Sequence, residues 1–146
     1  MNIREMTIAD YDAVFALWTA TEGLGLNRQN DSREGIAKFL ARNPESCFVA
    51  EEGGKIIGVI MAGSDGRRAY IYHTAVSAEH RGKGIGSALL KKCTDTLTAQ
   101  GVHKVALLVF AQNEAGNAFW EKHGFIKRTD VNYRNKTLIE HTRLDS

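Results

Sequence analysis

One short stretch of alternating basic residues and glycines, Arg81–Gly86, has the composition of an anion-binding turn. It lies between an apolar run, Tyr70–Val76, and a helical pattern, Ser87–Gln100. A turn that leads into a helix presents unpaired backbone N–H groups, and the helix dipole there favours negative charge. Glycines let the backbone approach an anion closely, and Arg and Lys add charge-assisted donors. The stretch therefore predicts a phosphate-binding turn, although a solvated glycine-rich turn has the same spacing.

A second segment, Asn113–Phe125, has the pattern of a short helix that starts after an asparagine cap and stops at a glycine. Together with Val76 and Arg81–Gly86, it resembles the GNAT superfamily of acetyl-CoA-dependent N-acyltransferases. The family's first motif, Arg or Gln followed by spaced glycines, is matched by Arg81, Gly84 and Gly86. Its later Asn, aromatic residue and Gly-Phe pair are matched by Asn113, Trp120, Gly124 and Phe125. The resemblance is close from about Lys55 to Phe125.

The resemblance implies that an acetyl group passes from acetyl-CoA to an amine by direct attack within a ternary complex. In this family the coenzyme arm enters a gap between two diverging strands, here those of Val76 and Val105–Phe110, and the glycine turn holds the pyrophosphate. The residues expected at the coenzyme are Ala75, Val76, Arg81, Gly82, Lys83, Gly84, Ile85, Gly86, Ser87, Asn113 and Trp120. No metal ion and no covalent nucleophile is expected.

The elements that must position these residues alternate along the chain. Strands are expected at Asn2–Met6, Ser46–Glu51, Lys55–Gly63, Tyr70–Val76, Val105–Phe110, Phe125–Tyr133 and Thr137–Leu144. Helices are expected from Thr7 to Glu22, from Ser32 to Asn43, over Ser87–Gln100 and after Asn113. This order predicts a mixed α/β (α+β) fold of the GNAT type in a single domain, 1–146. Its central sheet is twisted and mostly antiparallel, has one splayed parallel pair, and is flanked by about four helices.

Composition narrows the class of protein. With 146 residues, 43% of them apolar, the chain is long enough for one domain with its own core. The net charge of +2 arises from interleaved acidic and basic residues, so no nucleic-acid partner is expected. Cys47 and Cys93 form no CxxC motif and are interpreted as reduced core thiols. Without an apolar leader or spanning run, the expected location is the cytoplasm, with no membrane partner, and a homodimer is left open.

Trp120 departs from the family pattern. Many members carry tyrosine at this position, where the phenol is thought to protonate the departing thiolate. An indole N–H is a donor without useful acidity. A thiol with a reference pKa of about 8.5 is a fair leaving group without help. We interpret Trp120 as a packing aromatic, with Tyr72 and Tyr133 as the alternative acids.

A base is needed because an amine with a pKa of about 10.4 is protonated at neutral pH. The candidates are His73, Glu22 and Asp65. His73 is preferred because an imidazole titrates near neutrality and because this residue precedes the expected thioester-binding stretch. A histidine packed in the core is the alternative interpretation. Three other histidines, His103, His123 and His141, fall at the ends of elements and are interpreted as solvated.

The acceptor is left open. By resemblance, its groove is formed by Glu22–Asp31 and Tyr133–Lys136, whose charges are mixed, so the amine of a small molecule, a peptide or a protein fits equally well. Two other classes remain. One is a non-catalytic acyl-CoA-binding sensor, which is favoured by the presence of Trp120 in place of the family's tyrosine. The other is a nucleotide-phosphate-binding module, although the turn lacks the Gly-Lys-Ser/Thr ending of a P-loop.

Overall fold

The structure is a computed structural model that describes residues 1–140. Its centre is one five-stranded sheet, in which the strands lie in the order of the chain. The strands are β1 (Asn2–Glu5), β2 (Cys47–Glu52), β3 (Lys55–Ser64), β4 (Ala69–Val76) and β5 (Val105–Leu107). The first four pair antiparallel, and β4 pairs parallel with β5. The predicted mixed sheet with one parallel pair is confirmed.

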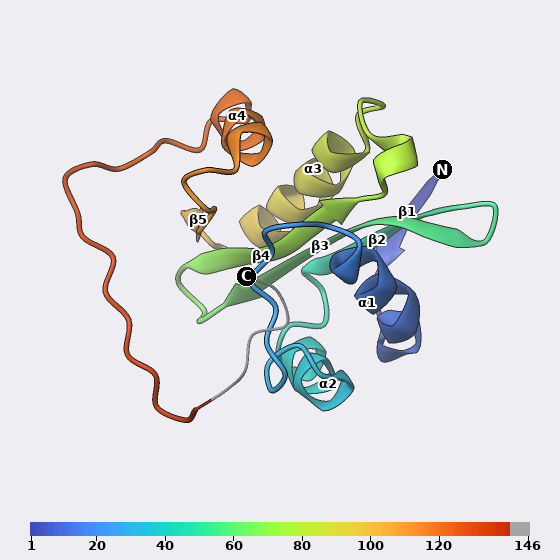
Figure 1. Cartoon of the computed structure of the whole chain (residues 1–146), viewed down its shortest axis with the longest axis horizontal. Coiled ribbons are helices and arrows are strands. Elements are labelled where there is room, and N and C mark those ends of the chain that lie inside the picture. Colours follow the sequence, from blue (N-terminus) through green and yellow to red (C-terminus); the bar gives the residue numbers. More distant parts are fainter. Residues whose placement is uncertain (141–146) are drawn as a thin grey trace.

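Four α-helices cover the two faces of this sheet (Figure 1). They are α1 (Tyr11–Thr19), α2 (Arg33–Arg42), α3 (Ile85–Ala99) and α4 (Glu114–Lys122). Helices α1 and α2 lie on one face, and α3 and α4 lie on the other. The Ser32 hydroxyl caps α2 by accepting a hydrogen bond of 3.0 Å from the Gly35 backbone, as predicted. Helix α1 ends at Thr19 rather than near Glu22.

Alternate residues of the sheet enter two separate cores, because successive side chains of a strand point to opposite faces. Ile60 and Ala62 pack with α3, whereas Val59 and Met61 pack with α1 and α2. Both faces of the central strands are therefore buried, which explains their continuous apolar sequence.

Strand β4 carries a bulge that reverses this alternation. Pairing passes from Val59–Ala75 directly to Met61–Tyr72, so two residues, His73 and Thr74, stand opposite one residue of β3. His73 is the one non-glycine residue with a positive φ, 40°, within the described part of the chain. Before the bulge Ile71 belongs to the α3 core, and after it Ala75 belongs to the core beneath α1 and α2.

The predicted C-terminal hairpin is wrong. Residues 126–140 contain no strand, and the part of the expected strand Thr137–Leu144 beyond residue 140 lies outside the described residues. The trace after α4 stands away from the sheet (Figure 1), and Ile126 and Leu138 are 85% and 88% exposed. Strand β5 ends at Leu107 instead of Phe110, so it offers only a short edge for pairing. The backbone also bends at 129–131, where Arg128 binds Asp130 at 2.6 Å.

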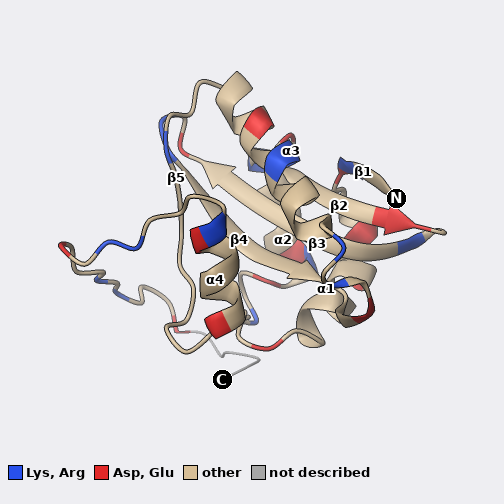
Figure 2. Ribbon diagram, turned by 90° about the horizontal axis from the view of Figure 1, so that it is seen from above, with Lys and Arg blue, Asp and Glu red and all other residues tan. Residues whose placement is uncertain are grey.

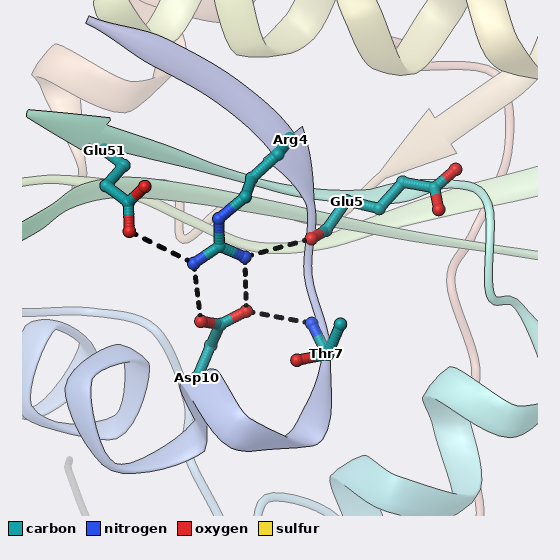
Figure 3. Close-up of polar contacts among 5 residues, drawn as sticks. All are labelled: Arg4, Glu5, Thr7, Asp10 and Glu51. Atoms are coloured by element: carbon teal, nitrogen blue, oxygen red, sulfur yellow. Dashed lines mark hydrogen bonds and ion pairs between the residues drawn. The ribbon is translucent and has the colours of Figure 1, made fainter. Parts of the chain in front are cut away.

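A polar cluster ties the start of the chain to the sheet (Figure 3). Arg4 of β1 binds both carboxylate oxygens of Asp10, at 2.9 and 2.8 Å, and also Glu51 of β2, at 3.2 Å. The Asp10 carboxylate accepts a further bond of 2.9 Å from the Thr7 backbone. The hydrogen bonds from Arg4 hold the pKa of Asp10 below its usual value. We call these residues the Arg4 cluster; it joins β1, β2 and the turn before α1.

Candidate functional site

A cleft of about 650 Å³ opens where β4 and β5 separate. The pairing of these two strands ends at Ile71 and Leu107, although β4 continues to Val76. In the described chain no strand therefore lies against the β5 side of β4 beyond Ile71. Ala75 and Val76 line one wall of the cleft and Leu108 lines another. An amide-bearing chain in this gap could pair with the free backbone of β4 as an added strand does.

One buried polar group at the cleft supports this interpretation. The Thr74 hydroxyl has no hydrogen-bond partner among the described residues, although its oxygen is buried. Thr74 belongs to the bulge and lines the cleft. Because an unpaired buried hydroxyl is unfavourable, a polar ligand between β4 and β5 would supply a partner that the chain itself does not.

The glycine turn closes one end of the cleft. Gly82 and Gly84 have φ of +77° and +82°, a left-handed conformation that glycine adopts without steric cost. Gly84 directly precedes α3, so the backbone N–H groups of the first turn face the cleft end. Gly86 is small for a different reason, because a Cβ there would lie 3.2 Å from the ring of Phe119 in α4. The turn thus combines a helix N-terminus with close packing of α3 against α4.

The polar side chains of the turn differ in placement. Arg81 lines the cleft, and its Nε donates to the Val76 carbonyl at 3.1 Å, which anchors the guanidinium at the end of β4. Lys83 is exposed and lies outside the set of residues that line the cleft. Ser87 lines the cleft and contacts His123 at 2.9 Å. The interpretation of His123 as solvated is therefore wrong, whereas His141 lies outside the described residues.

Helix α4 forms the opposite wall. Asn113 caps it, with its side-chain oxygen accepting a bond of 2.9 Å from the Gly116 backbone, and the same residue lines the cleft. Trp120 also lines the cleft, but its ring packs edge-on against Phe119 and Phe125 at centroid distances of 4.9 and 5.1 Å. All the residues expected at the coenzyme except Lys83 thus line one cleft.

The three candidate bases separate clearly. His73 and Glu22 line the cleft, whereas Asp65 lies in the exposed β3–β4 turn and is not among the lining residues. The Asp65 carboxylate is occupied by the backbone N–H groups of Arg67 and Arg68, which lower its pKa. The structure therefore leaves His73 and Glu22 as candidates.

His73 has a partner that sequence reasoning missed. Its Nε2 lies 2.7 Å from Oδ1 of Asp31, in the loop between α1 and α2. The two residues are 42 positions apart, and no local motif links them. Sequence reasoning considered Asp31 only as a charge of the acceptor groove. The bulge in β4, which brings the pair together, has no signal in the sequence.

The two cysteines and the two candidate tyrosine acids differ in burial and in distance from the cleft. Burial raises the pKa of Cys47 and Cys93 to about 12, so neither thiol ionises at neutral pH. Both are free, as predicted. Tyr72 lines the cleft, and burial raises the pKa of its phenol. Tyr133 is 62% exposed and is not among the cleft residues. Tyr72 is thus the better placed of the two candidate acids.

The described residues contain neither a cluster of metal ligands nor a membrane-spanning helix. Within residues 1–140, no group of three or more His, Cys, Asp and Glu side chains is arranged to hold a metal ion. None of the described helices has the length and apolar character needed to cross a membrane. Acidic and basic residues share the helices α3 and α4 rather than separating onto different ones (Figure 2).

Comparison with known proteins identifies the class. The sequence model described as Acetyltransferase (GNAT) family matches residues 11–125. An acetyltransferase of Sodalis glossinidius is 34% identical over 140 residues, which are 96% of this chain and 97% of that protein. An acetyltransferase of Pectobacterium atrosepticum has the same identity and coverage. The chain belongs to the GNAT family of acetyltransferases and is an acyltransferase. Membership of this family excludes the alternative that the chain is a nucleotide-phosphate-binding module.

Solved structures agree on the fold. The PaiA N-acetyltransferase of Thermoplasma acidophilum, solved with coenzyme A, superposes with a TM-score of 0.76 at 22% identity, covering 90% of this chain and 92% of that one. A predicted acetyltransferase of Clostridium acetobutylicum, solved with acetyl-CoA, gives 0.73 at 20% identity, with 92% and 95% covered. At these identities the likeness concerns the fold, and the fold is that of the GNAT acetyltransferases.

Proposed function

We propose that this chain is an N-acetyltransferase that moves the acetyl group of acetyl-CoA to a primary amine by direct attack. The observation that carries the proposal is the cleft itself, which is lined both by the glycine turn before α3 and by His73. The reaction requires a site for the phosphates of acetyl-CoA and a base near the attacking amine, and these two features of the cleft would supply them.

The coenzyme end is argued from the backbone. The N–H groups at the start of α3, with Gly82 and Gly84 in left-handed conformations, suit a pyrophosphate. Arg81, whose Nε is held by Val76, is placed to add its terminal N–H groups to the same phosphate. Lys83 lies outside the cleft lining and contributes at most long-range attraction. The pantetheine arm would lie along Ala75 and Val76, opposite Asn113.

The chemical end is argued from proton balance. His73 takes one proton from the ammonium form of the acceptor, the neutral nitrogen forms a bond to the acetyl carbon, and the carbon–sulfur bond breaks to release the coenzyme thiolate. The nitrogen loses its second proton as the amide forms. Backbone donors near Ala75 and Val76 would stabilise the developing oxyanion. Trp120 is packed against two aromatic rings and supplies no acid. The second proton of the nitrogen goes to the thiolate or to solvent, and Tyr72 can relay it by giving its own proton to the thiolate and taking the one from the nitrogen.

The test combines ligand binding with turnover. We expect acetyl-CoA to raise the melting temperature, because a ligand that binds only the native state stabilises it, whereas NAD has no such effect. Thiol release from acetyl-CoA is then followed with a panel of amines that contains a polyamine, an aminoglycoside, free amino acids and a peptide with a free N-terminus. No shift at millimolar acetyl-CoA would refute the proposal, and a shift without turnover on any amine would favour the sensor.

Three further inferences accompany the proposal. We infer that residues 1–146 form a single domain and that the protein acts in the cytoplasm. For the oligomeric state, we consider a monomer and a homodimer. None of them bears on the chemistry of the cleft. Size-exclusion chromatography with light scattering decides the last.

A further inference from the structure

We propose that Asp31 is a positioning residue that holds the ring of His73 in one tautomer, with Nδ1 as the atom that takes the proton of the acceptor amine. This inference rests on the proposed function for the identity of the amine. It extends that function by naming a second residue, remote in sequence, on which the base depends.

Asp31 is held rigidly on every side. It is 4% exposed, and its Oδ2 accepts a bond of 2.8 Å from the Asn27 backbone. Its own carbonyl accepts a bond of 2.7 Å from the Tyr11 hydroxyl. Oδ1 faces His73 Nε2 at 2.7 Å. Both carboxylate oxygens and the backbone are therefore occupied, so the direction of Oδ1 toward the imidazole is set by the loop and by α1.

The pairing of Asp31 is unusual for a buried carboxylate. A buried charge needs a partner of opposite charge or several hydrogen bonds. Within the described residues, the only basic side chain that contacts Asp31 is that of His73. The buried charge is therefore matched by a group that can gain and lose a proton, instead of by a permanent cation.

This contact fixes which nitrogen of the ring is free. An ionised carboxylate only accepts hydrogen bonds, so Nε2 of His73 carries the proton and Nδ1 of the neutral ring has the lone pair. Nδ1 makes no hydrogen bond to any residue that the structure describes. His73 lines the cleft, and its side chain is 15% exposed, so a small acceptor has access to it.

The rest of the surroundings holds the ring in place. Trp18 packs edge-on against the imidazole at 5.0 Å between centroids, and its indole N–H donates to the His73 carbonyl at 3.1 Å. The bulge places His73 on the side of α1, where Trp18 and Asp31 lie. In a regular strand His73 would share the α3 face with Ile71, two residues away. The positive φ of His73 is thus the strained conformation that creates the pair.

Few other titratable groups face this ring. Among the described residues that line the cleft, Glu22 is the one carboxylate and His80 is a second imidazole. Tyr11 lies behind Asp31, and Tyr72 precedes His73 on β4. Burial raises the pKa of both phenols, so they stay neutral where an imidazole titrates. A pH limb of turnover that depends on Asp31 therefore reports the imidazole of His73, provided that Glu22→Gln and His80→Gln both leave the limb in place.

The decisive variant is Asp31→Asn. The Asn27 N–H must still meet an acceptor, so the amide oxygen takes the place of Oδ2 and the amide NH₂ faces Nε2 of His73. An NH₂ group only donates, and the imidazole must then accept at Nε2 and carry its proton on Nδ1. We expect the turnover efficiency, kcat/KM, to fall by about 10²–10⁴ while the affinity for acetyl-CoA is unchanged.

The matched control is Asp10→Asn, the same chemical change at a buried aspartate of the Arg4 cluster. It should lower the melting temperature and leave turnover and its pH dependence as in the wild type. The tautomer is read directly from the ¹⁵N shifts of the histidine rings, with the His73 signals identified by their absence in His73→Gln. Wild type should show the Nε2–H form, and Asp31→Asn should show the Nδ1–H form.

The outcomes separate the two proposals. A wild-type ring in the Nδ1–H form, or a tautomer that Asp31→Asn leaves unchanged, would overturn the role of Asp31 whatever the activity. A switched tautomer with unchanged kcat/KM would also overturn it. Failure of the wild type to release thiol with any amine would instead refute the proposed function, and the ¹⁵N shifts would still show whether Asp31 sets the tautomer.

Discussion

Among residues 1–140, the two buried aspartates, Asp10 and Asp31, are 8% and 4% exposed but have different kinds of partner. Asp10 is paired with Arg4, which keeps its charge at every pH that the protein meets. Asp31 is paired with His73, whose imidazole, unlike a guanidinium, can gain and lose a proton. Arg4 joins two strands and a turn (Figure 3), whereas His73 lines a cleft. A permanent cation suits a structural link, and a titrating partner suits proton transfer.

The largest effect is expected at the titrating pair. His73→Ala removes the proposed base, so kcat/KM should fall by about 10²–10⁴ and the acidic limb of its pH profile should disappear. Steady-state kinetics between pH 5 and 9 make the measurement. His103→Ala is the control, because this histidine is exposed and lies outside the cleft. If the limb persists in His73→Ala, then His73 and Asp31 are a structural pair like Arg4 and Asp10.

Two glycine variants distinguish the cost of backbone strain from the loss of acetyl-CoA binding. Gly84→Val forces a branched side chain into a left-handed φ of +82°, and Gly101→Val does the same at +84° after α3. An added Cβ meets no atom within 4 Å at either glycine. Both variants should lose about 1–2 kcal/mol of unfolding free energy. Only Gly84→Val should also weaken acetyl-CoA binding in calorimetry; equal affinities would show that the turn does not hold the phosphate.

Removal of the permanent cation should affect stability alone. Arg4→Ala leaves the buried carboxylate of Asp10 without its bidentate partner, at a cost of about 1–3 kcal/mol in the free energy of unfolding. Urea titration at neutral pH measures it. Thiol release per folded molecule should match the wild type. A loss of turnover with the fold intact would mean that the Arg4 cluster influences the cleft, and the contrast between the two aspartates would fail.

The smallest effect concerns pH and stability. The pKa of Asp10 is lowered in the folded state, mainly by the hydrogen bond from Arg4. Its stabilisation is therefore complete above the ordinary value of 3.8 and is lost as the pH falls below that value towards the folded pKa. Urea midpoints measured from pH 5 down to pH 2 should decline, and the decline should be shallower in Asp10→Asn. An identical slope in both proteins would assign the acid loss to other carboxylates.

Much of the fold and of the coenzyme end was predictable because local signals carry them. The capping residues Ser32 and Asn113, the glycines before α3 and the turn between β2 and β3 each act within a few residues. The resemblance to one family added the order of these segments, and the cleft then gathers them all except Lys83. The strand predicted at Phe125–Tyr133 is absent, because a strand also needs an edge to pair with.

By itself, the sequence determined most of the helices and strands, the glycine turn before α3 and the buried thiols, and it made His73 the preferred candidate for the base. Only the tertiary structure decided which face His73 occupies, which residue orients it and how far β5 runs beside β4. The reason is that turns and caps depend on neighbours in the chain, whereas a bulge depends on how one strand accommodates another. The contact between His73 and Asp31 joins positions 42 residues apart, and it exists because that bulge turns the imidazole toward the loop after α1.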